Sequence, residues 1–194
     1  MKMKKTNPII LNTFQENYKH VLMTTRFNNK TWQENVDYRE RHTKIGCIYG
    51  SPEPCSQNIG YDTIMFTLEM NNEENKIEGI GMVRNKAICG KYSIYDNGNY
   101  NRYVYLGKYR ISREEMSEEE EKLMQAFDIL CFTGKRHVKR GQGLRKFPID
   151  MLYKCSKKVD ILKYVSNMFK KRINNDPNQN QINAENEDND NAKN

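Results

Sequence analysis

Histidine is scarce in this sequence, with only His20, His42 and His137 among 194 residues, and the three lie far apart. A zinc site needs histidine or cysteine ligands at short, regular spacing, and neither a CxxC nor an HExxH motif occurs. The acidic run from Glu114 to Glu121 is typical of a solvated helix start, so no paired-carboxylate motif stands out. We therefore expect no metal site.

Long apolar runs are missing as well. Near the start of the chain the longest one runs only from Pro8 to Leu11, far shorter than a signal-peptide core or a membrane span. The five cysteines are odd in number and scattered, which is typical of reduced thiols. Cys131 lies in the apolar run FDILCF, which favours a core residue over a nucleophile paired with His137. We expect a soluble intracellular protein without a membrane partner.

Two nucleotide-binding motifs fail at decisive positions. The stretch EGIGMVRN begins like GxGxxG, but Arg84 replaces the third glycine. The pair Gly134-Lys135 ends like a P-loop, but Ile129 replaces the first glycine and Arg136 replaces the Ser or Thr that would hold magnesium. We expect no cofactor and a protein that is not an enzyme, with a catalytic site assembled from distant residues as an alternative.

Positive charge is in clear excess. The chain has 32 Lys and Arg against 25 Asp and Glu, a net charge of +7. Residues 174–194 hold nine Asn, five acids and one Lys, so residues 1–173 carry 31 basic and 20 acidic residues, or +11. A charge of this size indicates polyanionic partners: RNA or DNA, an anionic surface, or an acidic protein.

Composition divides the chain into three parts. Residues 1–13 are basic and polar, which predicts a flexible N-terminal arm. Residues 174–194 have almost nothing to bury, which predicts a disordered, Asn-rich acidic tail. Residues 14–173 have the length of a single globular domain.

Strands are expected in the first half of that domain. The segments 20–25 (HVLMTT) and 45–49 are candidates for single strands. Residues 62–86 contain two apolar runs joined by the polar turn NNEEN, which predicts a β-hairpin. Gly79 and Gly81 lie within its second strand and predict a bulge or a close approach of another backbone.

The remaining segments complete the predicted fold. Residues 92–109 predict a second hairpin that turns at DNGN, and the charged segment 28–42 predicts a short helix or an ordered loop. Ser117 and Glu120 form a capping box at the start of a helix, and an amphipathic helix spans about 156–173. Because strands precede helices without regular βαβ alternation, we expect an α+β fold. It would have a small, twisted, mainly antiparallel sheet or open barrel, with flanking helices and a C-terminal amphipathic helix.

The most basic segment is GKRHVKRGQGLRKFP, residues 134–148, and no acid occurs anywhere from Ile129 to Ile149. Gly141 and Gly143 let its backbone turn closely and present N–H groups to an anion. We predict that this loop binds phosphates, which supply affinity but no sequence information. The predicted phosphate-binding residues are Lys135, Arg136, Lys139, Arg140, Gln142, Arg145 and Lys146.

Aromatic side chains are the natural partners of unpaired bases, because each base presents a flat face for stacking. Half of the twelve tyrosines lie in the predicted second hairpin, beside Arg102, Lys108 and Arg110. The predicted base-stacking residues are Trp32, Tyr103 and Tyr105. The alternative is a place in the core, which we expect for half of the tyrosines of this hairpin and which also fits Trp32.

A resemblance to a known family follows from three of these segments. The run KIEGIGMVRN after the strand IMFTLEM, the early TW in a charged segment and the late basic stretch resemble the PUA-like superfamily, in particular its EVE and YTH branches. The resemblance covers about a third of the chain. It implies a small twisted barrel that binds RNA or modified DNA bases. YTH-type recognition uses a cage of several tryptophans, whereas this chain has one.

Composition carries a second resemblance. The abundance of Asn, Lys, Ile and Tyr, with few Ala and Pro, resembles proteins of AT-rich genomes, such as the mimivirus group of large DNA viruses or AT-rich protists. The sequence thus favours a non-enzymatic protein that binds RNA or DNA, in the host cytoplasm or a virus particle if it is viral. The alternative is a structural or packaging component of such a particle.

Overall fold

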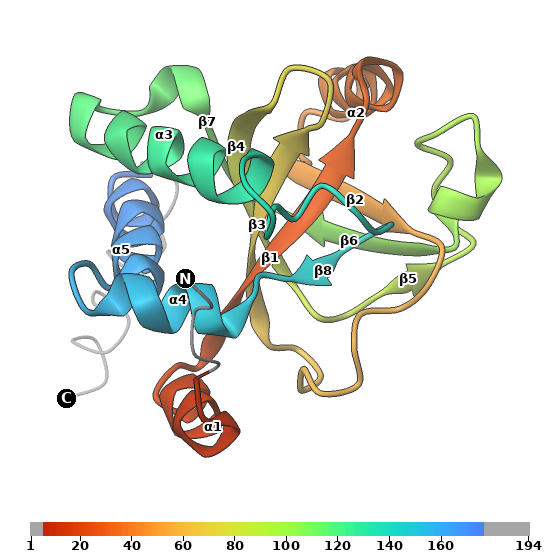
Figure 1. The fold of residues 1–194 in the computed structure, drawn as a ribbon. Coiled ribbons are helices and arrows are strands. Elements are labelled where there is room, and N and C mark those ends of the chain that lie inside the picture. Colours follow the sequence, from red (N-terminus) through yellow and green to blue (C-terminus); the bar gives the residue numbers. More distant parts are fainter. Residues whose placement is uncertain (1–5, 177–194) are drawn as a thin grey trace, which may run out of the picture.

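The computed structural model describes residues 6–176, which form an α+β fold of helices around two small sheets (Figure 1). The expected fold class is therefore confirmed. In chain order the elements are α1 (Pro8–Glu16), β1 (His20–Phe27), α2 (Asn29–Arg41), β2 (Cys47–Ser51), β3 (Ile64–Asn71), β4 (Lys76–Arg84), β5 (Ile88–Cys89), β6 (Tyr103–Gly107), β7 (Tyr109–Ser112), α3 (Glu118–Phe132), β8 (Arg145–Lys146), α4 (Ile149–Ser156) and α5 (Ile161–Asn174).

The strands form a five-stranded sheet in the order β7-β4-β3-β1-β8 and a three-stranded sheet in the order β2-β6-β5. Every strand pairing is antiparallel except that of β1 with β3, whose connection crosses over through α2 and β2. The sheets are thus mainly antiparallel, as the sequence predicts. Within the described residues no pairing joins the two sheets into a closed barrel.

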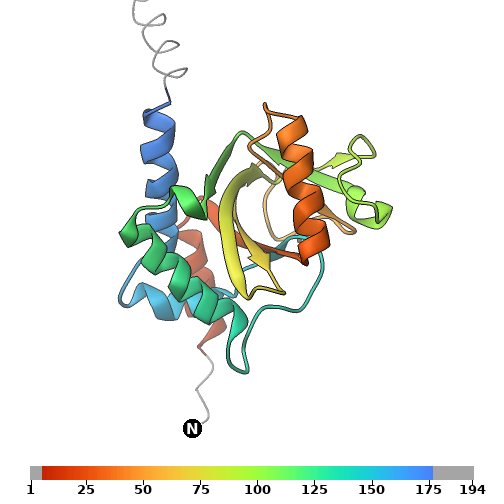
Figure 2. The ribbon, with the colours of Figure 1, turned by 90° about the horizontal axis from the view of Figure 1, so that it is seen from above.

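The central strands bury side chains on both faces. Along β1, Leu22 packs into a core beneath α3, α4 and α5, whereas Val21 and Met23 pack into a second core between the two sheets and α2. Figure 2 shows the five-stranded sheet between these two sides, with α3, α4 and α5 on one side and α2 on the other. Because both faces are covered, β1 and β3 are apolar at successive positions rather than at alternate ones.

The predicted hairpin at residues 62–86 is confirmed as β3 and β4, with a register shift between Glu69 and Met70. The predicted close approach at its glycines is also confirmed. A Cβ atom at Gly79 would lie 2.7 Å from the backbone oxygen of Ile111, and one at Gly81 would overlap the Tyr49 hydroxyl. The missing side chain at Gly81 thus lets a second-sheet tyrosine reach the five-stranded sheet.

The predicted second hairpin at residues 92–109 is wrong. Strand β6 pairs with β2 and β5, and the preceding residues form an irregular segment with a short 3-10 turn at Gly98–Asn101. The Asn101 side chain accepts hydrogen bonds from the backbone N–H groups of Ile94 and Tyr95 and donates one to the Tyr95 oxygen. These bonds satisfy backbone groups that a hairpin ladder would otherwise pair.

The predicted flexible arm is wrong for residues 8–13, which belong to α1. The Asn7 side chain accepts a hydrogen bond from Ile9 N–H at 2.9 Å, and Pro8 occupies a first-turn position where its missing N–H costs nothing. Phe14 holds this helix in place through edge-on ring contacts with Tyr18 and Tyr153.

The predicted last helix at about 156–173 is confirmed as α5, which begins five residues later, at Ile161, because α4 ends at Ser156 and the chain breaks between the two helices. The Asp160 side chain caps α5 by accepting a hydrogen bond from Lys163 N–H at 3.0 Å. Helix α5 continues to Asn174, the first residue of the predicted tail, and residues 177–194 lie outside the described part of the chain.

Candidate nucleic-acid interface

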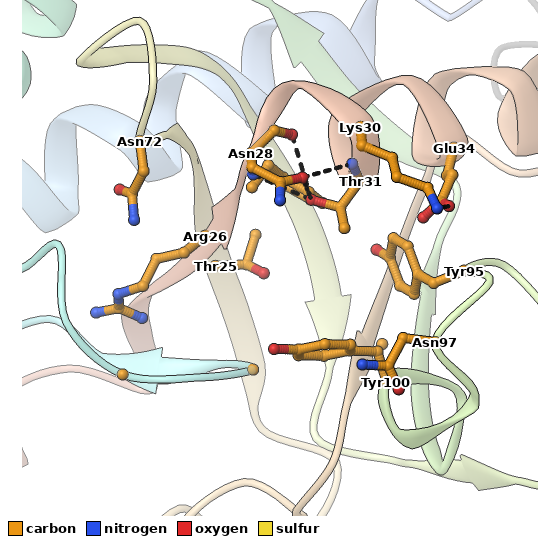
Figure 3. Close-up of a pocket in the computed structure, with 14 residues that line it drawn as sticks. Thr25, Arg26, Asn28, Lys30, Thr31, Glu34, Asn72, Tyr95, Asn97 and Tyr100 are labelled. Carbon is orange, nitrogen blue, oxygen red and sulfur yellow. Dashed lines mark hydrogen bonds and ion pairs between the residues drawn. The ribbon is translucent and has the colours of Figure 1, made fainter.

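A pocket of about 480 Å³ lies where β1 ends and α2 begins (Figure 3). Its walls come from the end of β1 with the first turns of α2, Gly50 of β2, the β3–β4 turn, the irregular segment around Tyr95 and Tyr100, and the glycine-rich loop at Gly141 and Gly143. The volume falls in the range of about 300–1,000 Å³ that is typical of small-molecule pockets. Five segments that are distant in sequence thus meet around one cavity.

The start of α2 forms the upper wall of this pocket in Figure 3. Asn28 accepts a hydrogen bond from Thr31 N–H at 2.8 Å, and the Thr31 hydroxyl lies 3.0 Å from the Asn28 N–H. This reciprocal capping fixes where the helix begins. It places the positive end of the helix dipole at the pocket, an arrangement that favours negative ligand groups.

Arg26 lines the pocket and has no carboxylate partner among the described residues. Its Nε donates a hydrogen bond to the Val138 backbone oxygen at 2.8 Å, but its Nη1 is buried without any partner in the described chain. Burial lowers the pKa of Arg26 to about 10, so the side chain is still charged at neutral pH. A buried, unpaired charge of this kind favours an anionic or carbonyl ligand.

Asn72 lies on the same side of the pocket as Arg26, opposite Tyr95 and Tyr100 (Figure 3). Its Nδ2 donates a hydrogen bond to the Lys139 backbone oxygen at 3.1 Å, whereas its Oδ1 is buried without a partner in the described chain. Buried polar atoms are nearly always hydrogen-bonded in proteins. Arg26 and Asn72 thus each keep one buried polar atom without a partner in the described chain.

The opposite side is aromatic. The rings of Tyr95 and Tyr100 lie 6.2 Å apart at 74°, so a flat ligand that stacks on one ring would meet the edge of the other. Tyr95 is buried, and its hydroxyl accepts a hydrogen bond from the Asn35 side chain at 3.1 Å. Burial raises the pKa of Tyr95, which keeps it neutral. Tyr100 is half-buried, and Figure 3 shows its hydroxyl directed towards the middle of the pocket.

The glycine-rich loop closes the remaining side. Gly141 has φ +111° and Gly143 has φ +61°, values that residues with a side chain rarely adopt. A Cβ atom at Gly143 would also overlap the Ser51 side chain. The loop is anchored beyond these glycines, because β8 pairs with β1 and the Thr24 hydroxyl donates a hydrogen bond to the Arg145 oxygen at 3.2 Å. Its backbone therefore borders the pocket directly.

The basic side chains of this loop divide into two groups. Lys135, Arg140 and Lys146 are exposed and form no ion pair with described residues. The others have partners: Arg136 pairs with Asp150, Arg145 lies 3.4 Å from Glu53, and Lys139 donates to the Asn75 side chain. Gln142 is exposed, and its backbone oxygen accepts a hydrogen bond from Arg145. The two paired arginines of the acid-free stretch thus find their carboxylate partners in other segments of the chain.

None of the three predicted base-stacking residues lines the pocket. Tyr105 is wrong for this role, because it is only 1 % exposed and its hydroxyl accepts a hydrogen bond from the Cys55 backbone N–H. Trp32 is partly buried and packs against the second core, with its ring centroid 5.3 Å from that of Phe27 and the guanidinium groups of Arg39 and Arg110 over its ring. Tyr103 is half-buried on β6.

The structure places Tyr95 and Tyr100 at the pocket instead. Both belong to the tyrosine-rich segment that the sequence singles out, on either side of DNGN. Their spacing in the sequence does not predict this placement, because Tyr95 is held by hydrogen bonds to Asn101 in the irregular segment and to Asn35 in α2.

A buried polar network supports the pocket from behind. Glu69 is fully buried; it accepts hydrogen bonds from the Tyr49 hydroxyl at 2.8 Å and from Arg110 at 2.7 Å. Burial alone lowers the pKa of Arg110, but the Glu69 carboxylate outweighs this and raises it. Arg110 lies over Trp32 of α2, and Asn35 of the same helix holds Tyr95. The network thus ties the sheet to the helix that carries one pocket wall.

The candidate catalytic residues do not meet in this pocket. The Nδ1 of His137 is buried without a hydrogen-bond partner in the described chain, and His137 does not line the pocket. Cys131 is fully buried, and burial raises its pKa to about 12, as for an inert core thiol. No group of three or more His, Cys, Asp or Glu residues among residues 6–176 is placed to hold a metal ion. No helix in that part of the chain has the length and apolar character needed to cross a membrane.

Comparisons with known proteins identify no relative of this chain. No protein-family model, no curated protein and no solved structure matches this chain.

Proposed function

We propose that this protein binds unpaired nucleic acid, RNA or DNA, with one base in the pocket and the neighbouring phosphates on the glycine-rich loop. The observation that carries the proposal is that the pocket and the basic, glycine-rich loop are neighbours. The pocket offers aromatic and hydrogen-bonding walls. The loop that lines it through Gly141 and Gly143 also carries, outside the pocket lining, the exposed cations Lys135, Arg140 and Lys146. A nucleotide has a flat, hydrogen-bonding base and an anionic phosphate, so it matches both features.

The two sides of the pocket would act differently on the base. Tyr100 would stack on its face, with the edge of Tyr95 against it. Across the cavity, the polar side chains of Arg26 and Asn72 would bond its polar edge. Hydrogen-bonding side chains on this wall give the site a reason to prefer a base over a purely apolar ring.

We also propose a relation to the PUA-like superfamily, whose members bind RNA or modified DNA bases. The residues that carry the resemblance are IMFTLEM and KIEGIGMVRN, which lie in β3 and β4, the TW on α2 and the basic loop before β8. Of these segments, the TW pair lines the pocket through Thr31 and the basic loop through Gly141 and Gly143, which supports the proposal.

Neutralising the free cations tests the phosphate contacts. The triple variant Lys135→Gln, Arg140→Gln, Lys146→Gln should weaken binding of single-stranded oligonucleotides at least about tenfold, because three phosphate contacts are lost. The slope of log affinity against log salt should become shallower by about 2 for single strands. Fluorescence anisotropy with labelled single- and double-stranded RNA and DNA at several salt concentrations measures both quantities.

The matched control removes the same charge from another surface. Lys163, Lys170 and Lys171 are exposed on α5, and their replacement by Gln should leave the salt slope within about 0.5 of wild type. If both triple variants lose affinity equally, only the net charge matters and the loop is not the binding site. Absence of any salt-dependent binding by wild type at micromolar protein would reject the proposal itself.

A further inference from the structure

A second concavity lies in the helical layer, on the other side of the five-stranded sheet from α2. It is a groove of about 500 Å³ between α3 and the corner at which α4 leads into α5. In Figures 1 and 2, α3, α4 and α5 lie together on one side of the five-stranded sheet. The groove shares no lining residue with the pocket at the end of β1.

Helix α3 has a second apolar face that packing within the chain covers only in part. Met124 and Phe127 are fully buried in the core beneath the helix. Leu123, Ala126 and Leu130 follow one another at i, i+3 and i+7, so they share a different face, and this face lines the groove. Leu123 and Leu130 are half-buried and Ala126 is exposed. A soluble helix normally turns polar residues outwards, so this face is available to a partner.

The opposite wall of the groove is also apolar. Val159, in the short connection between α4 and α5, is 48 % exposed, and Cys155 and Tyr164 lie on either side of it in sequence. Val159 belongs to neither hydrophobic core, so its side chain does not contribute to the packing of either core. Two apolar helical walls that face one groove match the way an amphipathic helix is recognised.

The rim of the groove is mainly positive. Lys122, Lys154 and Lys158 line it, against the single acid Glu119. Lys154 is shared with Asp150 at 3.6 Å, while Lys122 and Lys158 form no ion pair with described residues. A partner with acidic residues beside its apolar ones would complement this rim, whereas a basic partner would be repelled.

We propose that this groove docks an amphipathic helix of a partner protein, with apolar side chains between α3 and Val159 and acidic side chains against Lys122 and Lys158. The chain's own residues 177–194 are acidic but contain only Ile182 as a large apolar residue, so they lack the groups that would fill the groove. This inference is independent of nucleic-acid binding.

Two labelled peptides test it. Both are helical and place leucines at i, i+3, i+4 and i+7; one carries glutamates beside the leucines and the other lysines. We expect the glutamate peptide to bind the full chain at least about tenfold more tightly in fluorescence anisotropy. The variant Val159→Glu should weaken that binding at least about tenfold, because it puts a charge into the apolar contact. The charge reversal Lys122→Glu with Lys158→Glu should instead favour the lysine peptide.

The control is Ile129→Glu on α3, a residue that is 63 % exposed and does not line the groove. It should change peptide binding less than about twofold, and all variants should keep the wild-type circular dichroism spectrum and nucleic-acid affinity. Equal binding of both peptides would overturn the proposal, as would binding that Val159→Glu leaves intact. Binding to phosphatidylserine vesicles but to neither peptide would overturn it in favour of a lipid surface.

Discussion

Glu69→Ala is expected to lower the free energy of unfolding by about 3–5 kcal/mol, the largest effect of any single substitution considered for this protein. Glu69 is fully buried and neutralises Arg110, whose side chain is only 11 % exposed. Removing the carboxylate leaves a buried guanidinium without its partner and also removes the acceptor of the Tyr49 hydroxyl. Urea unfolding followed by circular dichroism measures the change.

The control applies the same chemical change to an exposed ion pair. Glu53 is 69 % exposed and lies 3.4 Å from Arg145, so Glu53→Ala should cost at most about 1 kcal/mol. A loss below about 1 kcal/mol for Glu69→Ala would show that the buried network does not hold the sheet to α2. Other contacts would then have to hold α2, which forms one wall of the pocket, against the sheet.

Tyr100→Leu is expected to weaken binding of single-stranded RNA or DNA by about 1–3 kcal/mol, which is roughly 5- to 150-fold. Leucine keeps an apolar side chain in the half-buried site but removes the flat ring on which a base would stack. Tyr100→Phe keeps the ring and should remain within about threefold of wild type. Fluorescence anisotropy at one fixed salt concentration gives these ratios.

Tyr103→Leu distinguishes this site from the one that the sequence predicts. Tyr103 is half-buried like Tyr100 but lies on β6 and does not line the pocket. We expect it to leave affinity within about threefold of wild type. A large loss for Tyr103→Leu with none for Tyr100→Leu would move base binding to the surface of the small sheet.

The parts of the fold that follow from local patterns could be predicted. The β3–β4 hairpin follows from two apolar runs and a polar turn, and the start of α3 follows from the Ser117 cap. The predicted hairpin at 92–109 is wrong because one side chain, Asn101, replaces the ladder with its own hydrogen bonds. Such a competition between side chain and backbone leaves no periodic signal in the sequence.

The candidate site could be predicted only in part. The basic loop and its glycines are visible in the sequence, but the pocket is built by contacts across long separations. Arg26 becomes a pocket residue because Val138 accepts its hydrogen bond from 112 positions away. Arg136 is less available to bind a phosphate because it pairs with Asp150, the first residue after the acid-free stretch. Neither effect can be derived from composition or spacing.

The most direct test of the central claim is a ¹H–¹⁵N correlation spectrum of the protein, titrated with a single-stranded oligonucleotide of about ten nucleotides. If a base enters the pocket, we expect saturable chemical-shift changes of the Gly141 and Gly143 amides and of the Asn72 side-chain amide. The backbone amide of Lys170 on α5 should not shift. These three groups line the pocket and would sense a base inside it. Saturable binding that leaves all three signals in place would contradict the proposal that a base enters this pocket.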